Sequence, residues 1–286
     1  MKKIIYILLT LSVFQSSCET DADIPIPQQD PKLVLSAFLQ PGAERQFAKL
    51  YMSDPIFDGS NIDFTSMINN ADVFISDGVK TVKFAYDFNV DSYVILSDSF
   101  NINYNTEYTI TAKYEGKEVN SIVKTISATP IQIVEVKFDS LIEETPFGYS
   151  TKTYFGFAKW VDPPQEKNYY CIEMYALVKN ITGDTSRISL SDFYSSLYLS
   201  DEGKNGNSMT AIIEAYQYNP EIVTNGYIGY ELLISKTDEA YFRYFKSLQN
   251  YGGDDPFSEP SLIYSNVNNG LGIVASFAPF SFKKGL

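Results

Sequence analysis

The chain has 286 residues, and 22 Lys and Arg against 35 Asp and Glu give it a formal net charge of −13. It has no histidine and only two cysteines, which excludes Ser-His-Asp and Cys-His catalysis, histidine-ligated zinc or haem, four-cysteine metal sites and multi-disulfide scaffolds. The isoelectric point of about 4.5 argues against nucleic-acid binding, because neutralising phosphates requires an excess of Lys and Arg.

Residues 1–17 predict a secretory signal peptide. Lys2 and Lys3 form a basic start, and the apolar run over 4–14 is too short for a transmembrane helix. Cys18 follows two small residues, an arrangement that resembles the lipobox of bacterial lipoproteins. We therefore expect cleavage before Cys18 and a lipid anchor on its sulfur and amino group. The alternative is an ordinary signal peptide with a chance cysteine nearby.

Residues 18–31 predict an acidic, proline-rich tether between the lipid and the fold, because Pro25, Pro27 and Pro31 exclude a helix or a strand ladder. Removal of the signal would leave a formal side-chain charge of −15. The acidic residues beside the anchor resemble the surface-export signal of Bacteroidetes lipoproteins, although a solvated acidic spacer would look the same. These export-signal candidates are Glu19, Asp21 and Asp23. We expect a lipid-anchored protein of the outer membrane, exposed at the cell surface.

Residues 32–128 predict an antiparallel β-sandwich of the immunoglobulin or fibronectin-III type. Short runs with β-strand patterns alternate with turn residues, and Asp77-Gly78 and Glu115-Gly116 are hairpin signals. The core disulfide of many immunoglobulin domains is absent. The expected strands are 32–39, 45–51, 71–76, 80–86, 92–96, 107–114 and 119–126.

Residues 129–286 predict a second β-rich domain with one helix near Thr237–Tyr251. Thr237, Asp238 and Glu239 form a helix start signal, and aromatic residues recur at helical spacing up to Gly252-Gly253. The second cysteine, Cys171, lies in an apolar stretch and is expected to be a small buried hydrophobe. The expected strands are 131–138, 151–161, 168–181, 209–218, 227–235, 262–264 and 271–277.

Several strings in the mature chain carry a family resemblance. They are KLVLSAFLQPG at 32–42, NYY at 168–170, YFRY at 241–244, DPFSEP at 255–260 and SNVNNGLGI at 265–273. With the lipobox cysteine and the tether, they resemble the Bacteroidetes DUF4249 lipoprotein family over essentially the whole mature chain. The resemblance implies an outer-membrane lipoprotein, commonly encoded beside a TonB-dependent receptor, and it implies no catalytic residues.

Three pairs of neighbouring carboxylates could in principle serve glycosidase chemistry. They are Glu143 with Glu144, Asp201 with Glu202, and Asp254 with Asp255. All three lie in expected turns, where acidic residues are common because water solvates them. The sequence also lacks the contexts of a serine nucleophile, so we assign no catalytic residue and no cofactor beyond the lipid.

Two further patterns are weak candidates for a modification and a metal site. Asp139-Ser140-Leu141 resembles an O-glycosylation sequon of Bacteroidetes secreted proteins, although three-residue motifs also occur by chance. Asp201, Asn205 and Asn207 offer oxygen donors in a glycine-punctuated loop, but their spacing is not that of a calcium-binding hand. A plain turn explains these three residues better.

The first functional hypothesis is a non-enzymatic binding or accessory subunit of a TonB-dependent receptor that handles a nutrient or an exported protein. Binding would use an aromatic, acidic surface, since 22 Tyr offer amphipathic contact area. The alternative is a structural subunit that stabilises an outer-membrane complex and binds no small ligand. The sequence does not identify the ligand or the aromatic residues that would contact it.

Overall fold

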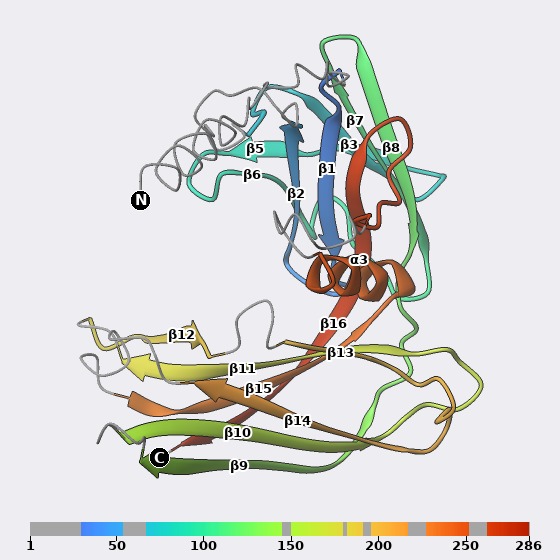
Figure 1. Ribbon diagram of the computed structural model, residues 1–286. Helices are drawn as coiled ribbons and strands as arrows, with labels where there is room; N and C mark the ends of the chain where they lie inside the picture. Colours follow the sequence, from blue (N-terminus) through green and yellow to red (C-terminus); the bar gives the residue numbers. More distant parts are fainter. Residues whose placement is uncertain are drawn as a thin grey trace, which may run out of the picture.

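The computed structural model describes residues 30–53, 67–144, 150–179, 182–190, 196–216, 227–251 and 262–285. Two β-sandwich halves are stacked, and a short helix, α3, lies between them (Figure 1). The prediction of a mostly β chain with one C-terminal helix is confirmed. None of the described helices is long and apolar enough to cross a membrane.

The first half packs two sheets around a core of alternating side chains. In β1, the residues Leu33, Leu35, Ala37 and Leu39 are buried while those between them are not, as a strand with one core-facing side requires. One sheet has the order β1-β2-β6-β5 and the other β4-β3-β7-β8. The bounds are β1 Leu33–Leu39, β2 Arg45–Met52, β3 Asp72–Ser76, β4 Thr81–Lys83, β5 Ala85–Asp87, β6 Ser92–Leu96, β7 Glu107–Tyr114 and β8 Lys117–Lys124.

The single strand expected over 80–86 is two strands in different sheets. β4 pairs with β3, whereas β5 pairs with β6. Phe84 lies between them, is buried in the core and donates its backbone N–H to the carbonyl of Val73. The chain therefore crosses from one sheet to the other at Phe84, because this large side chain is buried between the layers.

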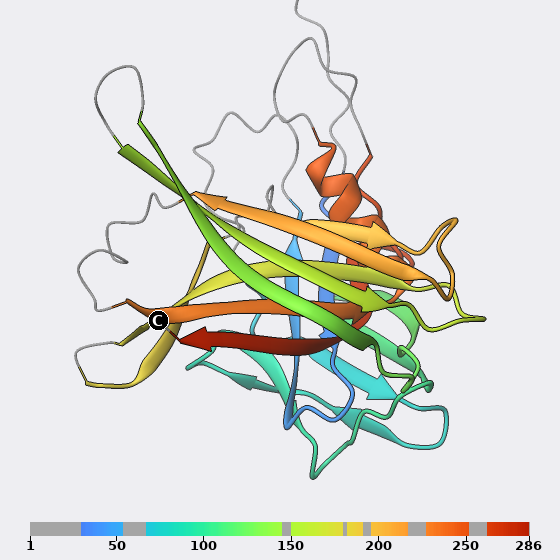
Figure 2. The ribbon, with the colours of Figure 1, turned by 90° about the horizontal axis from the view of Figure 1, so that it is seen from below.

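The second half is also a sandwich. Figure 2, seen from below, shows β9, β10 and β14 as the near layer, crossing the strands of the layer behind. Trp160 on β10 and Tyr170 on β11 meet edge to face in the core between the layers, with 5.1 Å between ring centroids. The bounds are β9 Gln132–Glu144, β10 Ser150–Val161, β11 Tyr169–Lys179, β12 Thr185–Ser189, β13 Leu197–Ser200, β14 Ser208–Tyr216 and β15 Tyr227–Thr237.

The last strand, β16 (Leu271–Gly285), belongs to both halves. Its first part runs parallel to β1, and its second part runs antiparallel to β15. The expected strand ended at Phe277, eight residues earlier, because Pro279 and two lysines gave the rest the composition of a tail. In addition, Val267 and Val274 lie in the core of the first half, so the C-terminal segment returns to the fold of residues 32–128.

Helix α3 (Glu239–Gln249) fills the junction between the halves. Asp238 caps its start by accepting a hydrogen bond from the Tyr241 N–H at 2.8 Å, so the helix begins slightly after the expected Thr237. Its aromatic side chains pack on Phe38 of β1, with a centroid distance of 5.8 Å to Phe245.

Strands β12 and β13 were not expected, and residues 262–264 do not form the expected strand.

Candidate binding face

The strand β11 has one side in the core and one side facing α3 and the first half. Tyr170, Ile172, Met174 and Ala176 belong to the core of the second half. The side chains between them therefore point to the other side, which is the upper side of this layer in Figure 1. We call this side, with Glu173, Tyr175, Arg187, Glu231 and Ser281, the polar face.

A charged pair lies at the centre of the polar face. Tyr175 of β11 is opposite Glu231 of β15, and Arg187 of β12 is opposite Leu177. The guanidinium of Arg187 approaches both carboxylate oxygens of Glu231, with Nε to Oε2 at 2.6 Å and Nη2 to Oε1 at 2.9 Å. The Glu231 side chain has no exposed surface, whereas that of Arg187 is 49% exposed. The hydroxyl of Ser281 on β16 also donates to Glu231 Oε1, whereas Glu231 Oε2 has the ionic contact with Arg187 Nε but no hydrogen bond among the described residues.

Glu173 lies diagonally across the sheet from this pair, because its direct partner on β15 is Leu233. The Tyr175 hydroxyl donates a hydrogen bond to Glu173 Oε1 at 3.1 Å, and the Arg187 guanidinium lies 5.8 Å from the centre of the Tyr175 ring. Burial raises the pKa of the Glu173 carboxyl, and the nearby charge of Arg187 only partly opposes this. Glu173 is therefore a half-buried acid without an ion pair among the described residues.

The polar face ends in an aromatic wall under α3. Cys171 is fully buried there, as expected, and burial raises the pKa of its thiol, so it behaves as an inert small hydrophobe. Tyr198 of β13 stacks on Phe245 with 5.3 Å between ring centroids, and Tyr241 lies against the same ring. Along β11, the polar face therefore changes from an apolar environment at Cys171, under α3, to the charged pair of Arg187 and Glu231 beside Tyr175.

Reasoning from the sequence did not select Glu173 or Glu231. It considered only carboxylates that are neighbours in sequence, and these two lie on different strands. One signal was present: each is a single acid within an apolar strand, in NYYCIEMYALVK and YIGYELLISK. A charge inside a buried strand must be paired or functional, because its desolvation is costly.

A second surface lies on the outer side of the β9-β10-β14 sheet. Phe155, Phe157 and Ile212 are side by side there, since Phe157 pairs directly with Ile212. Lys137 lies 5.9 Å from the Phe157 ring centre and forms an ion pair with Glu135 at 2.6 Å. The hydrophobic side chains on this surface are not the tyrosines that the sequence favoured. Of the second-half tyrosines, Tyr154, Tyr169, Tyr170, Tyr198 and Tyr230 are buried.

A serine and a lysine meet where the linker between β8 and β9, residues 125–131, joins the second half. Lys236 Nζ lies 2.7 Å from Ser127 Oγ, but it also forms an ion pair with Glu166 at 3.0 Å and is only 5% exposed. Ser127 donates to the same carboxylate at 2.6 Å. An ion-paired ammonium has no lone pair with which to accept the serine proton, so this cluster fastens the linker and does not activate a nucleophile.

The loop with the calcium candidates has structural hydrogen bonds. Asp201 Oδ2 accepts the Asn168 N–H at 2.9 Å, and Asn205 Oδ1 accepts the Gln165 N–H at 3.0 Å. The amide of Asn207 donates to the Asn205 carbonyl. The side-chain oxygens of Asp201 and Asn205 thus tie two loops together by hydrogen bonds. In the part of the chain that the structure describes, no group of three or more Asp, Glu or Cys side chains could hold a metal ion.

The other predicted positions are scattered or lie outside the described residues. Ser140 is exposed on β9, an edge strand, and stays a candidate for modification. Glu143 and Glu144 end β9, and their side chains are not described. Cys18, the export-signal candidates Glu19, Asp21 and Asp23, and the pair Asp254 and Asp255 lie outside the described residues.

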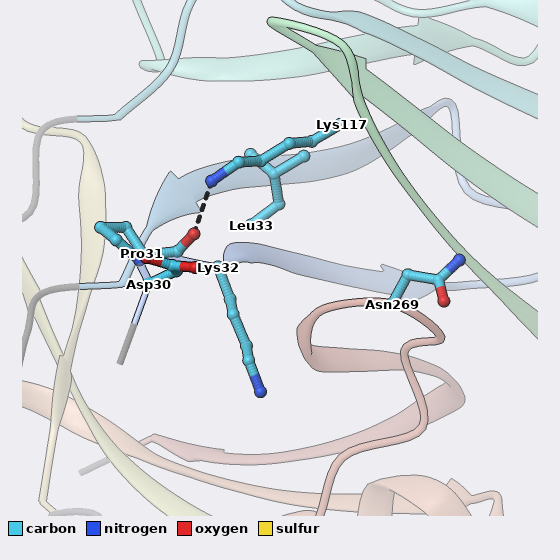
Figure 3. Close-up of a pocket in the computed structure, with 6 residues that line it drawn as sticks. All are labelled: Asp30, Pro31, Lys32, Leu33, Lys117 and Asn269. Atoms are coloured by element: carbon cyan, nitrogen blue, oxygen red, sulfur yellow. Dashed lines mark hydrogen bonds between the residues drawn. The ribbon is translucent and has the colours of Figure 1, made fainter. Parts of the chain in front are cut away.

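Residues 30–32 enter β1 at the pole of the first half that is farthest from the second half (Figure 1). Lys117, after the β7-β8 turn, reaches across to Pro31 and donates to its carbonyl at 2.6 Å (Figure 3). Lys32 exchanges hydrogen bonds with Ser53 at 2.8 and 2.9 Å. The side chains around a shallow hollow here thus fix the point at which the tether leaves the sandwich.

A family model described as "Domain of unknown function (DUF4249)" matches residues 19–282, which is nearly the whole chain. The chain belongs to the DUF4249 family. No curated protein sequence matches this DUF4249 chain.

Solved structures give distant neighbours. One is a protein from Bacteroides uniformis ATCC 8492 described as a candidate carbohydrate binding protein, with 9% identity, a TM-score of 0.22, and coverage of 72% of this chain and 88% of that one. Another is the BSP domain of a biofilm associated protein, with 8% identity, a TM-score of 0.19, and coverage of 92% and 62%. At such scores neither neighbour indicates a ligand for this DUF4249 chain.

Proposed function

We propose that this DUF4249 protein is a lipid-anchored, non-enzymatic binding subunit of the outer membrane. It works with a TonB-dependent receptor in handling a nutrient or an exported protein. Cys18 carries the lipid, residues 18–31 form the tether, and the polar face of the second half contacts the ligand. The family resemblance supports the proposed receptor partnership, and the geometry of the polar face supports the proposed binding role.

The observation that carries the proposal is the combination of charges on the polar face. A sheet that only covered a core would need no carboxylate at Glu173, because this carboxylate contributes no ion pair and its burial is unfavourable. A partly buried carboxylate without a counter-ion is typical of binding and catalytic sites. The half-exposed Arg187 and the exposed Ser281 make the same face accessible to a ligand.

The position of the tether supports this role. The chain leaves the first half at the pole held by Lys117 and Ser53, and the second half lies at the other end of the molecule (Figure 1). An anchor at Cys18 would therefore hold the first half near the membrane and present the second half away from it. Several acyl chains give stable anchoring, at roughly 0.8 kcal/mol per buried CH₂ group.

Binding without catalysis is favoured by the chemistry of the described residues. The closest approach to a nucleophile and base, Ser127 with Lys236, is neutralised by Glu166. Glu231 is held in a bidentate pair with Arg187 and lacks the freedom of a general acid or base. These arrangements therefore support non-covalent binding.

The anchor is tested by membrane fractionation of wild type and a Cys18→Ala variant. We expect the wild type in the membrane fraction and the variant released from it. A Cys171→Ala variant is the matched control, because that buried thiol has no part in anchoring and its variant should stay with the membrane. Retention of Cys18→Ala at the membrane would show that the lipobox interpretation is wrong.

The alternative is a structural subunit that stabilises an outer-membrane complex without a ligand. A screen of glycans and peptides against the purified mature chain separates the two functions. A ligand whose binding is lost on Tyr175→Ala, and kept on Tyr251→Ala as a control at the end of α3, supports the binding subunit. Absence of any ligand, with a stable complex still recovered from membranes, supports the structural subunit.

A further inference from the structure

We propose that Glu173 binds a cationic group, an alkylammonium or guanidinium, carried on the lysine or arginine side chain of a peptide. This inference rests on the proposed function, since it names the ligand class for the polar face. It is argued from the pairing of charges on that face, from the aromatic groups around Glu173, and from the apolar surface beside it.

The charges on the polar face leave one carboxylate unmatched. Arg187 is committed to Glu231 by two contacts of 2.6 and 2.9 Å. Glu173 has only the neutral hydroxyl of Tyr175 as a hydrogen-bond donor among the described residues. Two other cations lie on this side: Lys283 is opposite Glu231 on β16, so strand β15 separates it from β11, and Lys179 is six residues further along β11, opposite Thr185. A ligand cation would supply the missing counter-charge to Glu173.

Two tyrosine side chains lie near this carboxylate on the same side of the sheet. Tyr175 donates to it directly, and Tyr198 of β13 is opposite Cys171, which is two residues from Glu173 on β11. Aromatic rings attract cations through the negative faces of their π systems, and this attraction grows when water is excluded. A carboxylate bordered by tyrosines is therefore suited to an ammonium or guanidinium group.

The sheet beside Glu173 offers a place for an aliphatic stem. Leu233 is the direct partner of Glu173 on β15 and is partly exposed, and Ser281 is its partner on β16. Lysine and arginine side chains lay their methylene groups on apolar surface while the charged head reaches a polar group. The acidic chain, with a net charge of −13, would also raise the rate at which a cationic peptide arrives.

The test is a calorimetric titration of the mature chain with a short, neutral-ended peptide that contains one lysine. The same peptide with its lysine Nζ acetylated is the uncharged comparison, and spermidine is the free-amine comparison. We expect the lysine peptide to bind at least tenfold more tightly than the acetylated one, because a charge-assisted hydrogen bond is lost on acetylation. Weaker binding of spermidine than of the lysine peptide supports a peptide source.

The matched variants are Glu173→Gln, which removes the charge at nearly constant shape, and Glu214→Gln, which does so on the opposite, outer sheet. We expect Glu173→Gln to weaken binding of the lysine peptide at least tenfold and Glu214→Gln to leave it unchanged. The comparison of charged and acetylated peptides uses the unaltered protein, so it holds even if a variant folds poorly.

Equal affinity of wild type for the charged and acetylated peptides, or no binding of either, would overturn this inference. Tighter binding of spermidine than of the peptide would overturn the peptide source. The proposed function fails separately, in the glycan and peptide screen. A neutral ligand that binds in a Tyr175-dependent manner there would keep the binding subunit and remove only the cationic ligand class.

Discussion

The pair between Arg187 and Glu231 is the strongest electrostatic feature of the polar face at the scale of single residues. Glu231 is completely enclosed, so the loss of its cation would leave a buried charge without compensation. The half-exposed guanidinium admits some water, which reduces the cost below that of a fully enclosed pair. The pair fixes the position of the Tyr175 ring and, through it, that of Glu173.

We predict that Arg187→Met destabilises the protein by about 2–3 kcal/mol, because Glu231 then loses its counter-ion. Urea unfolding followed by circular dichroism measures this change. The double variant Arg187→Met with Glu231→Gln should recover most of the loss, since no buried charge is left. An Arg187→Met variant as stable as wild type would mean that water already compensates Glu231.

Asp238 gives the folded chain a pH dependence near neutrality. It caps α3 and also accepts the Ser276 N–H of β16 at 2.9 Å, so it joins the helix to the strand that spans both halves. Burial raises the pKa of its carboxyl from 3.8 to about 7, although several backbone N–H groups oppose this. Because the folded pKa is the higher one, the stability it contributes is complete below about pH 4 and is lost as the pH rises towards 7.

We predict that wild type loses about 2 kcal/mol between pH 5 and pH 7 relative to Asp238→Asn, which keeps the cap but cannot ionise. The measurement is the free energy of unfolding of both proteins at several pH values. If the free energies of unfolding of the two proteins change with pH in parallel, the raised pKa of Asp238 is contradicted. If the wild type becomes less stable than Asp238→Asn as the pH increases, the raised pKa is supported.

Strand β16 is the element that makes the two halves one molecule. Its parallel pairing with β1 brings Gly272 against the backbone of Leu35, at a φ of +114° that glycine tolerates and other residues rarely adopt. A Cβ atom at Gly272 would lie 2.0 Å from the Leu35 carbonyl oxygen. The close approach of the two strands therefore depends on this glycine.

We predict that Gly272→Ala costs about 3 kcal/mol or more, from backbone strain together with the steric overlap at Leu35. Gly116→Ala is the control, because Gly116 also has a positive φ but faces open space, so it should cost only about 1–2 kcal/mol. Thermal unfolding measures both. Equal effects of the two substitutions would indicate that β16 shifts away from β1 without penalty.

The elements show where sequence patterns succeed and where they fail. Alternation identified β7, and β1 has the same pattern, because each has one side in a core and one side outside it. The second part of β16 was missed, since Pro279 and the lysines mask the inward side chains Phe280 and Phe282. The polar face was missed because strand pairing, which a single sequence does not specify, brings Glu173 and Glu231 together.

At the scale of the whole molecule, the point where residue 31 enters the fold and the polar face lie in different halves. Lys117 holds Pro31 at one pole, and the polar face lies in the second half (Figure 1). Between them, α3 and the pair of Lys236 with Glu166 hold the junction. Because the polar face is turned toward α3 and the first half, this arrangement suits a subunit that holds a ligand beside the junction between the two halves.

The most direct test of the account is affinity purification of the full-length protein from native outer membranes, in a detergent that preserves receptor complexes. We predict recovery of a TonB-dependent receptor in amounts comparable to the DUF4249 protein, and its loss from the Cys18→Ala variant. Recovery of the DUF4249 protein alone, from membranes in which a known receptor complex survives the same detergent, would contradict the account.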